Sequence, residues 1–439
     1  MIENNLVEGS DSAPSPLEKA GGEAMGVLKI ATAGSVDDGK STLIGRLLYD
    51  TKSLTDDKID AIRNSSEKKG YDYLDFSLAT DGLVAEREQG ITIDVAHIYF
   101  STANKSYIIA DTPGHVEYTR NMVTGASTSQ VAIILIDARK GVIEQTYRHF
   151  FINNLLRIKD VIVAVNKMDL VGYDQSVFED IKQNFEKLNS NSTYVEQNVT
   201  YIPVSALKGD NVVKSSNEMS WYEGQTILEH LEGLQSTDVQ EDGNFRFAVQ
   251  TVIRPKTDEF HDFRGFAGKI NGGDLKVGDA VTVLPSMTTS KVKSIYFYDT
   301  PYESAKSGSS VTITLEDEIN VTRGDMLVKT NELPKVEKEI TATVCWMDSK
   351  QLSAGSRYIV QHNTNQVVSK IAEVGNVVST DFSGETASNG RLGLNEIGEV
   401  KIRLSKPVFI DTYVENKSNG SFILIDEQTN TTAGVGFIK

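Results

Sequence analysis

The chain has very little cysteine and no long apolar segment, and these shortages exclude several classes of protein. Its 439 residues include one cysteine, Cys345, within the run TATVCWM. This setting predicts a buried strand residue rather than a nucleophile or a metal ligand, and a chain without disulfides. A run of about 18 apolar residues is absent, so we expect no membrane-spanning helix. Residues 1–24 lack the cationic start and apolar stretch of a secretory signal, which predicts a cytoplasmic protein with a flexible polar tail.

Positive charge is also scarce. The chain has 44 Lys and Arg against 61 Asp and Glu, a net charge of −17. Because contacts to nucleic-acid phosphates need an excess of Lys and Arg, this balance disfavours a protein whose main partner is nucleic acid. The acidic balance does not exclude binding of a nucleotide, because charges farther than about a Debye length from a site are screened.

The pattern of apolar residues divides the chain into two regions. From Val27 to about Leu234, short apolar runs such as VLKIATA, VAIILID and VIVAVN alternate with amphipathic, helix-like segments. This predicts an α/β domain with a mostly parallel sheet and helices on both faces. After QSTDVQEDGN, short alternating strands and Gly-rich turns predict two all-β units, barrels or sandwiches. The expected boundaries are 25–238 for the α/β domain and 239–334 and 335–439 for two β-barrel domains.

Residues 34–41, GSVDDGKS, match the phosphate-loop pattern G-x-x-x-x-G-K-[ST] between a strand and a helix. Backbone amides of such a loop approach phosphates, and the helix N-terminus adds its positive end. We expect Lys40 to reach the β- and γ-phosphates and Ser41 to ligate Mg²⁺. A chance match on a surface loop is the alternative. The residues expected to contact the nucleotide here are Gly34, Ser35, Val36, Asp37, Asp38, Gly39, Lys40, Ser41 and Thr42.

A second motif, DTPGH, closes the apolar strand SYIIA. A carboxylate at Asp111 can hold a magnesium-bound water, and the Gly114 amide can sense the γ-phosphate. The alternative is an ordinary Asp-x-Pro-Gly turn at the end of a strand. The predicted nucleotide contacts in this motif are Asp111, Thr112, Pro113, Gly114 and His115.

A third motif, NKMD, predicts guanine rather than adenine. The Asp169 carboxylate would accept hydrogen bonds from guanine N1–H and its amino group, whereas adenine would leave this carboxylate unpaired. We expect Asn166 to tie neighbouring loops together, the stem of Lys167 to cover the base, and the segment SAL to offer an amide to guanine O6. The predicted base-binding residues are Asn166, Lys167, Met168, Asp169, Ser205, Ala206 and Leu207.

The segment EREQGITID supplies the remaining element, Thr92, which lies about fifty residues beyond Ser41. We expect Thr92, Ser41 and Asp111 to be the magnesium ligands. The segment that contains Thr92 can be ordered by GTP and released after hydrolysis. A single strand threonine with no such role is the alternative.

Along the chain, the motifs follow one another as GSVDDGKST, EREQGITID, DTPGH, NKMD and SAL. In that order they resemble the motifs of the translation-factor class of GTPases over most of the chain. Elongation factors commonly carry histidines where this chain has Ser35 and Asp38. The phrases GSVDDGKSTLIGRLLYDTK and DGLVAEREQGITIDVAHIYF look like the GTP-binding large subunit of bacterial sulfate adenylyltransferase. That resemblance implies a GTP hydrolase in a heterodimer whose small subunit converts ATP and sulfate into adenosine 5′-phosphosulfate and pyrophosphate. It also implies that the adenylylsulfate kinase domain fused to some relatives is absent.

The same resemblance implies individual roles. His115 would orient the attacking water and act with Lys40 and Thr92 in catalysis, while Val36 and Ile91 would form an apolar gate around His115. Asp37 would hold a monovalent cation. Arg87 is a candidate arginine finger, with a surface salt bridge as its alternative.

Two interpretations stay open in the sequence. The pair Trp221–Tyr222 either packs its loop onto the domain or contacts the small subunit. For the whole chain, a factor that delivers aminoacyl-tRNA to ribosomes is the alternative function, and a GTPase that serves only as a scaffold is a third.

Overall fold

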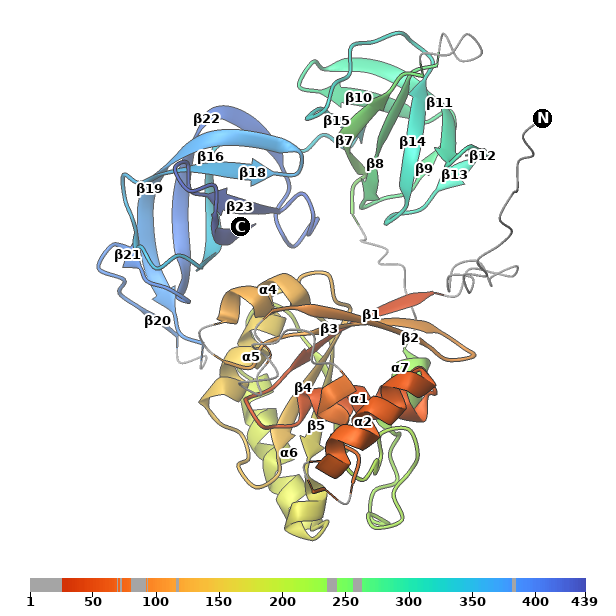
Figure 1. The fold of residues 1–439 in the computed structure, drawn as a ribbon. Coiled ribbons are helices and arrows are strands. Elements are labelled where there is room, and N and C mark those ends of the chain that lie inside the picture. Colours follow the sequence, from red (N-terminus) through yellow and green to blue (C-terminus); the bar gives the residue numbers. More distant parts are fainter. Residues whose placement is uncertain are drawn as a thin grey trace, which may run out of the picture.

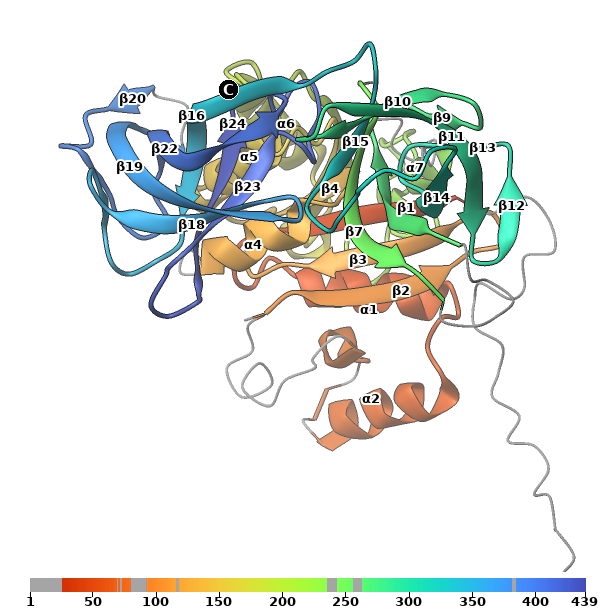
Figure 2. The same ribbon diagram turned by 90° about the horizontal axis from the view of Figure 1, so that it is seen from above.

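The computed structural model describes residues 26–68, 70–71, 73–79, 92, 94–115, 118–234, 243–255, 263–380 and 384–439. They form an α/β domain followed by two β-barrels, which confirms the predicted fold class. In both views the barrels lie beside each other over one side of the α/β domain, and helix α2 (Asp56–Lys68) lies away from them (Figure 1, Figure 2).

The sheet of the α/β domain has the strand order β2-β3-β1-β4-β5-β6. The strands are β1 (Val27–Ala33), β2 (Ala96–Ser101), β3 (Ser106–Asp111), β4 (Val131–Asp137), β5 (Asp160–Asn166) and β6 (Asn198–Pro203). β2 pairs with β3 in antiparallel fashion, and the other neighbouring strands are parallel. Every residue of β4 is buried, as expected for a central strand covered on both faces.

Alternate side chains of β4 enter two separate hydrophobic cores. Ile134 and Ile136 belong to a core that includes α5 and α6, whereas Ile133 and Leu135 belong to one that includes α1 and α7. Because successive strand side chains point to opposite faces, the uninterrupted apolar run VAIILI supplies both cores. The helices are α1 (Lys40–Asp50), α2 (Asp56–Lys68), α4 (Thr119–Ala126), α5 (Glu144–Leu155), α6 (Gln175–Asn189) and α7 (Ile227–Gly233), with short 3₁₀ helices η1 (Phe76–Ala79) and η3 (Met168–Val171).

The first barrel is a sheet in the order β10-β15-β7-β8-β14-β11-β12 that closes because β10 also pairs with β11. Its core contains Phe247, Ile270 and Leu327. The strands are β7 (Arg246–Ile253), β8 (Gly265–Asn271), β9 (Leu275–Lys276), β10 (Ala280–Leu284), β11 (Thr288–Phe297), β12 (Thr300–Tyr302), β13 (Ser304–Ala305), β14 (Ser310–Leu315) and β15 (Met326–Lys329).

The second barrel has the order β18-β23-β24-β16-β22-β19-β20 and closes through a β18–β19 pairing. Cys345 is buried in β16, which confirms the prediction of a buried strand residue. This burial raises the pKa of its thiol to about 12. The strands are β16 (Lys335–Trp346), β17 (Leu352–Ser353), β18 (Arg357–His362), β19 (Asn365–Val378), β20 (Glu385–Thr386), β21 (Arg391–Leu392), β22 (Ile397–Ile410), β23 (Ser421–Ile425) and β24 (Thr432–Ile438).

A buried ion pair joins the two barrels. The Arg246 guanidinium on β7 donates to both carboxylate oxygens of Asp411, at 2.7 and 2.8 Å, and Asn419 donates to the same carboxylate at 2.7 Å. The second barrel also contacts the α/β domain, because the Tyr413 hydroxyl donates to the Leu156 carbonyl at 3.3 Å. The three units therefore meet through specific polar contacts.

Some sequence predictions are not tested by this structure. The predicted tail, 1–24, and the boundary between residues 238 and 239 lie outside the described residues. The second predicted boundary directly precedes β16, which begins at Lys335. In the part of the chain that the structure describes, no helix is both long and apolar enough to cross a membrane.

Candidate functional site

The phosphate loop follows β1 at the carboxyl edge of the sheet and leads into α1. Asp37 and Gly39 have positive φ values of 68° and 96°. A Cβ atom on Gly39 would lie 2.4 Å from Asn166 Nδ2, so this position requires glycine for both its conformation and its space. The Ser35 N–H donates to Asp38 Oδ2 at 2.7 Å, which holds the loop in its curved shape. Burial raises the pKa of Asp38.

Lys40 is buried inside the curve of this loop. Its ammonium donates to the carbonyl oxygens of Gly34 at 2.8 Å and Ser35 at 3.3 Å. Burial lowers the pKa of Lys40, and the charge of Asp111 acts in the opposite direction. Gly114 also touches the loop, since a Cβ atom there would lie 2.2 Å from the Gly34 oxygen and 2.7 Å from Lys40 Nζ. The DTPGH motif and the phosphate loop therefore meet backbone to backbone.

A cavity of about 300 Å³ opens on this loop and gathers residues from several of the predicted motifs. Thr92, Gly114 and Lys167 share it with the phosphate loop, although they are far apart in sequence. Ser77 of η1 also lines the cavity, and nothing in the sequence pattern pointed to it. The lining residues are Ser35, Val36, Asp37, Gly39, Lys40, Ser41, Thr42, Ser77, Thr92, Gly114 and Lys167.

The three predicted magnesium ligands offer only oxygen atoms. Ser41 and Thr92 line the cavity, and Asp111 ends β3 beside it, with 2% of its surface exposed. The Thr32 hydroxyl donates to Asp111 Oδ1 at 3.1 Å and so orients this carboxylate. Mg²⁺ prefers oxygen ligands and commonly binds through one or two carboxylates together with substrate phosphates. The residues present therefore fit a magnesium ion held jointly with a nucleotide.

Asn166 connects the phosphate loop with the segment predicted to bind the base. Its Nδ2 donates to the Asp38 carbonyl oxygen at 2.7 Å, and its Oδ1 accepts from the Ala206 N–H at 2.9 Å. These contacts join segments 128 and 40 residues apart in sequence. One buried side chain thus fixes the spacing between the loop predicted to bind phosphates and the segment predicted to bind a base.

The two residues on either side of Met168 are also held in place. Lys167 adopts φ 65°, and its ammonium donates to the Asp37 carbonyl oxygen. Asp169, in η3, accepts a hydrogen bond from the Ser205 hydroxyl at 2.7 Å through Oδ1. The NKMD and SAL segments therefore lie together, although only Lys167 of the two segments lines the 300 Å³ cavity.

Asp137, which the sequence analysis did not single out, anchors Lys167. The Lys167 ammonium lies 3.0 Å from Asp137 Oδ2, and Arg139 binds the same carboxylate at 2.7 and 3.0 Å. Burial alone would raise the pKa of Asp137, but hydrogen bonds from Arg139 and Lys167 outweigh this effect and lower it. The sequence held a signal for this residue, because Asp137 closes the apolar run VAIILID just as Asn166 closes the run VIVAVN. The structure places the two residues in register on neighbouring strands.

His149 is a second residue that the sequence analysis passed over. It lies on α5 with 4% of its surface exposed, and a hydrogen bond links it to the Gly114 backbone. Burial lowers the pKa of His149 to about 3, and the positive charges of Lys40 and Arg148 act in the same direction. A neutral imidazole therefore supports the turn that carries Gly114.

The remaining predicted residues lie outside the cavity or outside the described residues. His115 is exposed directly after Gly114, with its ring 6.0 Å from that of Tyr118, and does not line the cavity. Ile91 and Arg87 lie outside the described residues. The Trp221 Nε1–H donates to the Tyr173 carbonyl at 3.0 Å, so the Trp221–Tyr222 loop packs onto its own domain.

Comparison with known proteins identifies the family of this chain. The Elongation factor Tu GTP binding domain family matches residues 25–252, and the GTP-eEF1A C-terminal domain-like family matches residues 339–439. Sulfate adenylyltransferase subunit 1 of Saccharophagus degradans is 47% identical over 414 residues, which are 94% of this chain and 86% of that protein. The chain belongs to the sulfate adenylyltransferase subunit 1 family.

Other members of this family and one solved structure show similar coverage of the chain. The subunit 1 protein of Bacteroides fragilis is 48% identical over 95% of this chain and 86% of its own length. The bifunctional enzyme CysN/CysC of Mycobacterium tuberculosis is 46% identical over 94% of this chain and 67% of its own length. The solved structure of bacterial selenocysteine-specific elongation factor EF-Sec is 21% identical over 94% of this chain and 58% of that chain, with a TM-score of 0.44.

Proposed function

We propose that this chain hydrolyses GTP as the large subunit of a heterodimer and thereby drives its small subunit to join ATP and sulfate into adenosine 5′-phosphosulfate and pyrophosphate. The single observation that carries the GTPase part is the position of Asn166, which binds the phosphate loop at Asp38 and the base segment at Ala206. Membership in the sulfate adenylyltransferase subunit 1 family supports the coupled reaction.

The coupling has a thermodynamic reason. Formation of a mixed anhydride between sulfate and phosphate is uphill, so a second, downhill reaction is needed to draw it forward. Hydrolysis of GTP to GDP and phosphate can do this if the two nucleotide states favour different conformations of the heterodimer. Thr92 lines the phosphate cavity, and its segment is the part we expect to respond to the γ-phosphate.

In the hydrolysis step, this chain's residues would position and neutralise charge. Lys40 would exchange its contacts with Gly34 and Ser35 for the β- and γ-phosphates, and the Gly114 amide would donate to the γ-phosphate. His115 would place the attacking water by hydrogen bonding. Magnesium, held by the ligand set described above, supplies positive charge at the β- and γ-phosphates when bound.

Guanine selection would rest on Asp169. The Ser205 hydroxyl occupies one side of its Oδ1 and fixes the direction of the carboxylate. A carboxylate oriented in this way can accept both N–H groups on the Watson–Crick edge of guanine, whereas adenine presents an acceptor there. Lys167, held by Asp137, would cover the face of the base with its stem.

The test compares stimulation of GTP hydrolysis by the expected partner with stimulation by ribosomes. The purified chain is assayed with the small subunit, ATP and sulfate, and separately with ribosomes. We expect stimulation by the small subunit together with its substrates. Stimulation by ribosomes alone would instead support the aminoacyl-tRNA delivery function. A cytoplasmic location stays a prediction from the sequence.

A further inference from the structure

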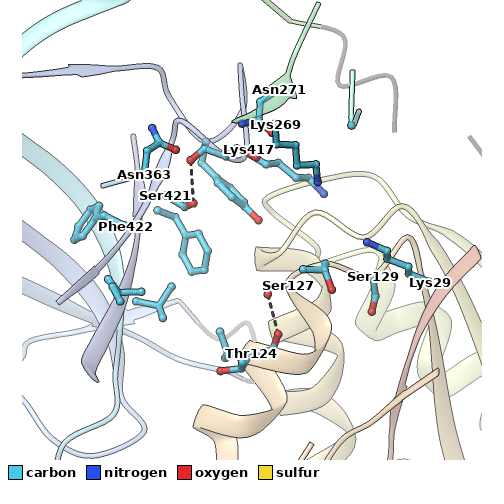
Figure 3. Close-up of a pocket in the computed structure, with 18 of the residues that line it drawn as sticks. Lys29, Thr124, Ser127, Ser129, Lys269, Asn271, Asn363, Lys417, Ser421 and Phe422 are labelled. Atoms are coloured by element: carbon cyan, nitrogen blue, oxygen red, sulfur yellow. Dashed lines mark hydrogen bonds between the residues drawn. The ribbon is translucent and has the colours of Figure 1, made fainter. Parts of the chain in front are cut away.

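A second cavity, of about 650 Å³, lies where the α/β domain meets both barrels (Figure 3). Lys29 and Ser129 reach it from the α/β domain, Lys269 from the first barrel, and Lys417 and Ser421 from the second barrel. None of its lining residues belongs to the cavity on the phosphate loop. The junction cavity is therefore a separate space that exists only where the three units come together.

The charge of this junction cavity is opposite to that of the whole chain. Lysines 29, 269 and 417 line it, each from a different unit, and its described lining contains neither Asp nor Glu. The chain as a whole has 61 acidic residues against 44 basic ones. Burial lowers the pKa of Lys29, and the positive charge of Lys269 lowers it further, so these two ammonium groups repel one another. An anion placed between them would relieve that repulsion.

Uncharged hydrogen-bond donors accompany the lysines. Ser307 lines the junction cavity with 4% of its surface exposed, and its hydroxyl has no hydrogen-bond partner among the described residues. A buried hydroxyl without a partner is costly, because it has given up its bonds to water. Ser127 also lines this space, but its hydroxyl already donates to the Thr124 carbonyl oxygen at 2.8 Å. Asn271 and Asn363 bring amide N–H groups to the same space (Figure 3). These groups match the many acceptor oxygens of a phosphate or sulfate group.

We propose that the junction cavity binds a small molecule that carries several negative charges on phosphate or sulfate groups and is larger than one inorganic anion. The volume lies within the range of about 300 to 1,000 Å³ typical of sites for small organic ligands. Tyr413, Phe422 and Phe437 line the second-barrel side and offer an apolar surface to the uncharged part of such a ligand. The proposal is independent of the proposed function, because it concerns neither the phosphate loop nor the small subunit.

Binding at this place has a consequence for the arrangement of the domains. Because the three lysines come from three units, a bound polyanion attracts all three units at once. It therefore stabilises the arrangement in which the three units enclose the cavity. Arrangements in which the barrels separate from β1 and α4 become less favourable in comparison. Any nucleotide state of the phosphate loop that changes this arrangement would change the affinity of the junction cavity, and the reverse would hold by linkage.

The test is calorimetric titration of the full chain, first saturated with GDP and Mg²⁺ so that the phosphate loop is filled. The probes are inorganic phosphate, sulfate, pyrophosphate and ATP, each at low ionic strength. We expect one saturable site for pyrophosphate, for ATP, or for both, and much weaker binding of phosphate and sulfate. Binding of pyrophosphate assigns the affinity to charge alone, whereas binding of ATP only assigns a nucleotide.

Two variants locate that binding. Lys269→Gln and Lys417→Gln should each weaken it about tenfold, the loss expected for one charge-assisted contact. Lys293→Gln is the matched control, because it removes the same charge from an exposed position of the first barrel outside the cavity. GDP affinity should be equal in all variants, which verifies folding. Absence of saturable binding to the GDP-loaded chain, or equal weakening by Lys269→Gln and Lys293→Gln, would overturn the proposal, as would phosphate binding as tight as pyrophosphate binding.

Discussion

The Ser205 hydroxyl donates a hydrogen bond to the Asp169 carboxylate at 2.7 Å, and so joins two segments that are 36 residues apart in sequence. This contact fixes the rotation of the carboxylate without neutralising its charge. An aspartate oriented in this way is suited to a partner that presents two adjacent donors, which is the pattern of guanine and not of adenine.

The first prediction concerns base specificity. Asp169→Asn replaces one acceptor oxygen with a donor amide, so GTP affinity should fall by about two orders of magnitude or more. Xanthosine triphosphate offers an acceptor where guanine offers a donor, and it should gain affinity. Competition against a fluorescent nucleotide measures both effects. Unchanged GTP affinity in this variant would remove Asp169 from the base site.

The second prediction concerns the attacking water. His115→Ala should keep nucleotide affinity while single-turnover GTP hydrolysis slows by about two orders of magnitude, because water placement is lost. His97→Ala is the control, since His97 is an exposed histidine on β2. If His115→Ala turns over GTP as fast as this control, the role of His115 is wrong.

The third prediction concerns the joint between the barrels. Arg246→Met leaves the Asp411 carboxylate buried without its ion partner, which should cost about 3 to 5 kcal/mol of stability. The double variant Arg246→Met with Asp411→Leu should recover much of this loss. Urea unfolding followed by the fluorescence of Trp346, in the second barrel, measures both changes when all variants carry Trp221→Phe.

Its control is the exposed pair Arg403–Glu339, whose side chains keep 68% and 49% of their surface exposed. Arg403→Met should change stability by less than about 1 kcal/mol, since water screens such pairs. Equal effects of Arg246→Met and Arg403→Met would contradict a structural role for the buried pair.

The fourth prediction concerns pH. His149 stays neutral in the folded chain down to a pKa of about 3, whereas in the unfolded chain it takes up a proton below its ordinary value of 6.5. Its contribution to stability is therefore complete above pH 6.5 and is lost progressively as the pH falls toward 3. Between pH 7 and pH 5 this loss amounts to about 2 kcal/mol.

The variant His149→Gln isolates this contribution from those of the many carboxylates. Between pH 7 and pH 5 its free energy of unfolding should fall by about 2 kcal/mol less than that of the unaltered chain. Urea titrations followed by the fluorescence of Trp221, in the α/β domain, supply the comparison when both proteins carry Trp346→Phe. Parallel pH curves for the two proteins would show that His149 does not titrate as described.

The α/β fold and most of the candidate site could be predicted because each depends on a local pattern. A continuous apolar run such as VAIILID specifies a strand buried on both faces, and phosphate-loop, DTPGH and NKMD motifs each follow such a strand. The carboxyl ends of parallel strands meet at one edge, so these motifs had to converge. The structure agrees, with Asn166 in contact with Asp38 and Ala206.

Contacts between distant segments were not predictable from such patterns. Arg246 and Asp411 are 165 residues apart, and neither lies in a recognisable motif. Ser77 and His149 acquire their positions from packing, which brings η1 and α5 against the nucleotide motifs. The junction cavity depends on the placement of three units, and no stretch of the sequence encodes that placement locally.

If GTP hydrolysis by this chain drives sulfate activation, the yield of pyrophosphate must depend on that hydrolysis. The chain and its small subunit are supplied with ATP and sulfate, and pyrophosphate is measured with GTP, with GDP and with a GTP analogue that cannot be hydrolysed. Of these three nucleotides, we expect only GTP to raise the yield of pyrophosphate, and in Lys40→Ala the yield with GTP should equal the yield with GDP. The same yield of pyrophosphate with all three nucleotides, in an assay where the added GTP is hydrolysed, would show that hydrolysis does not drive sulfate activation.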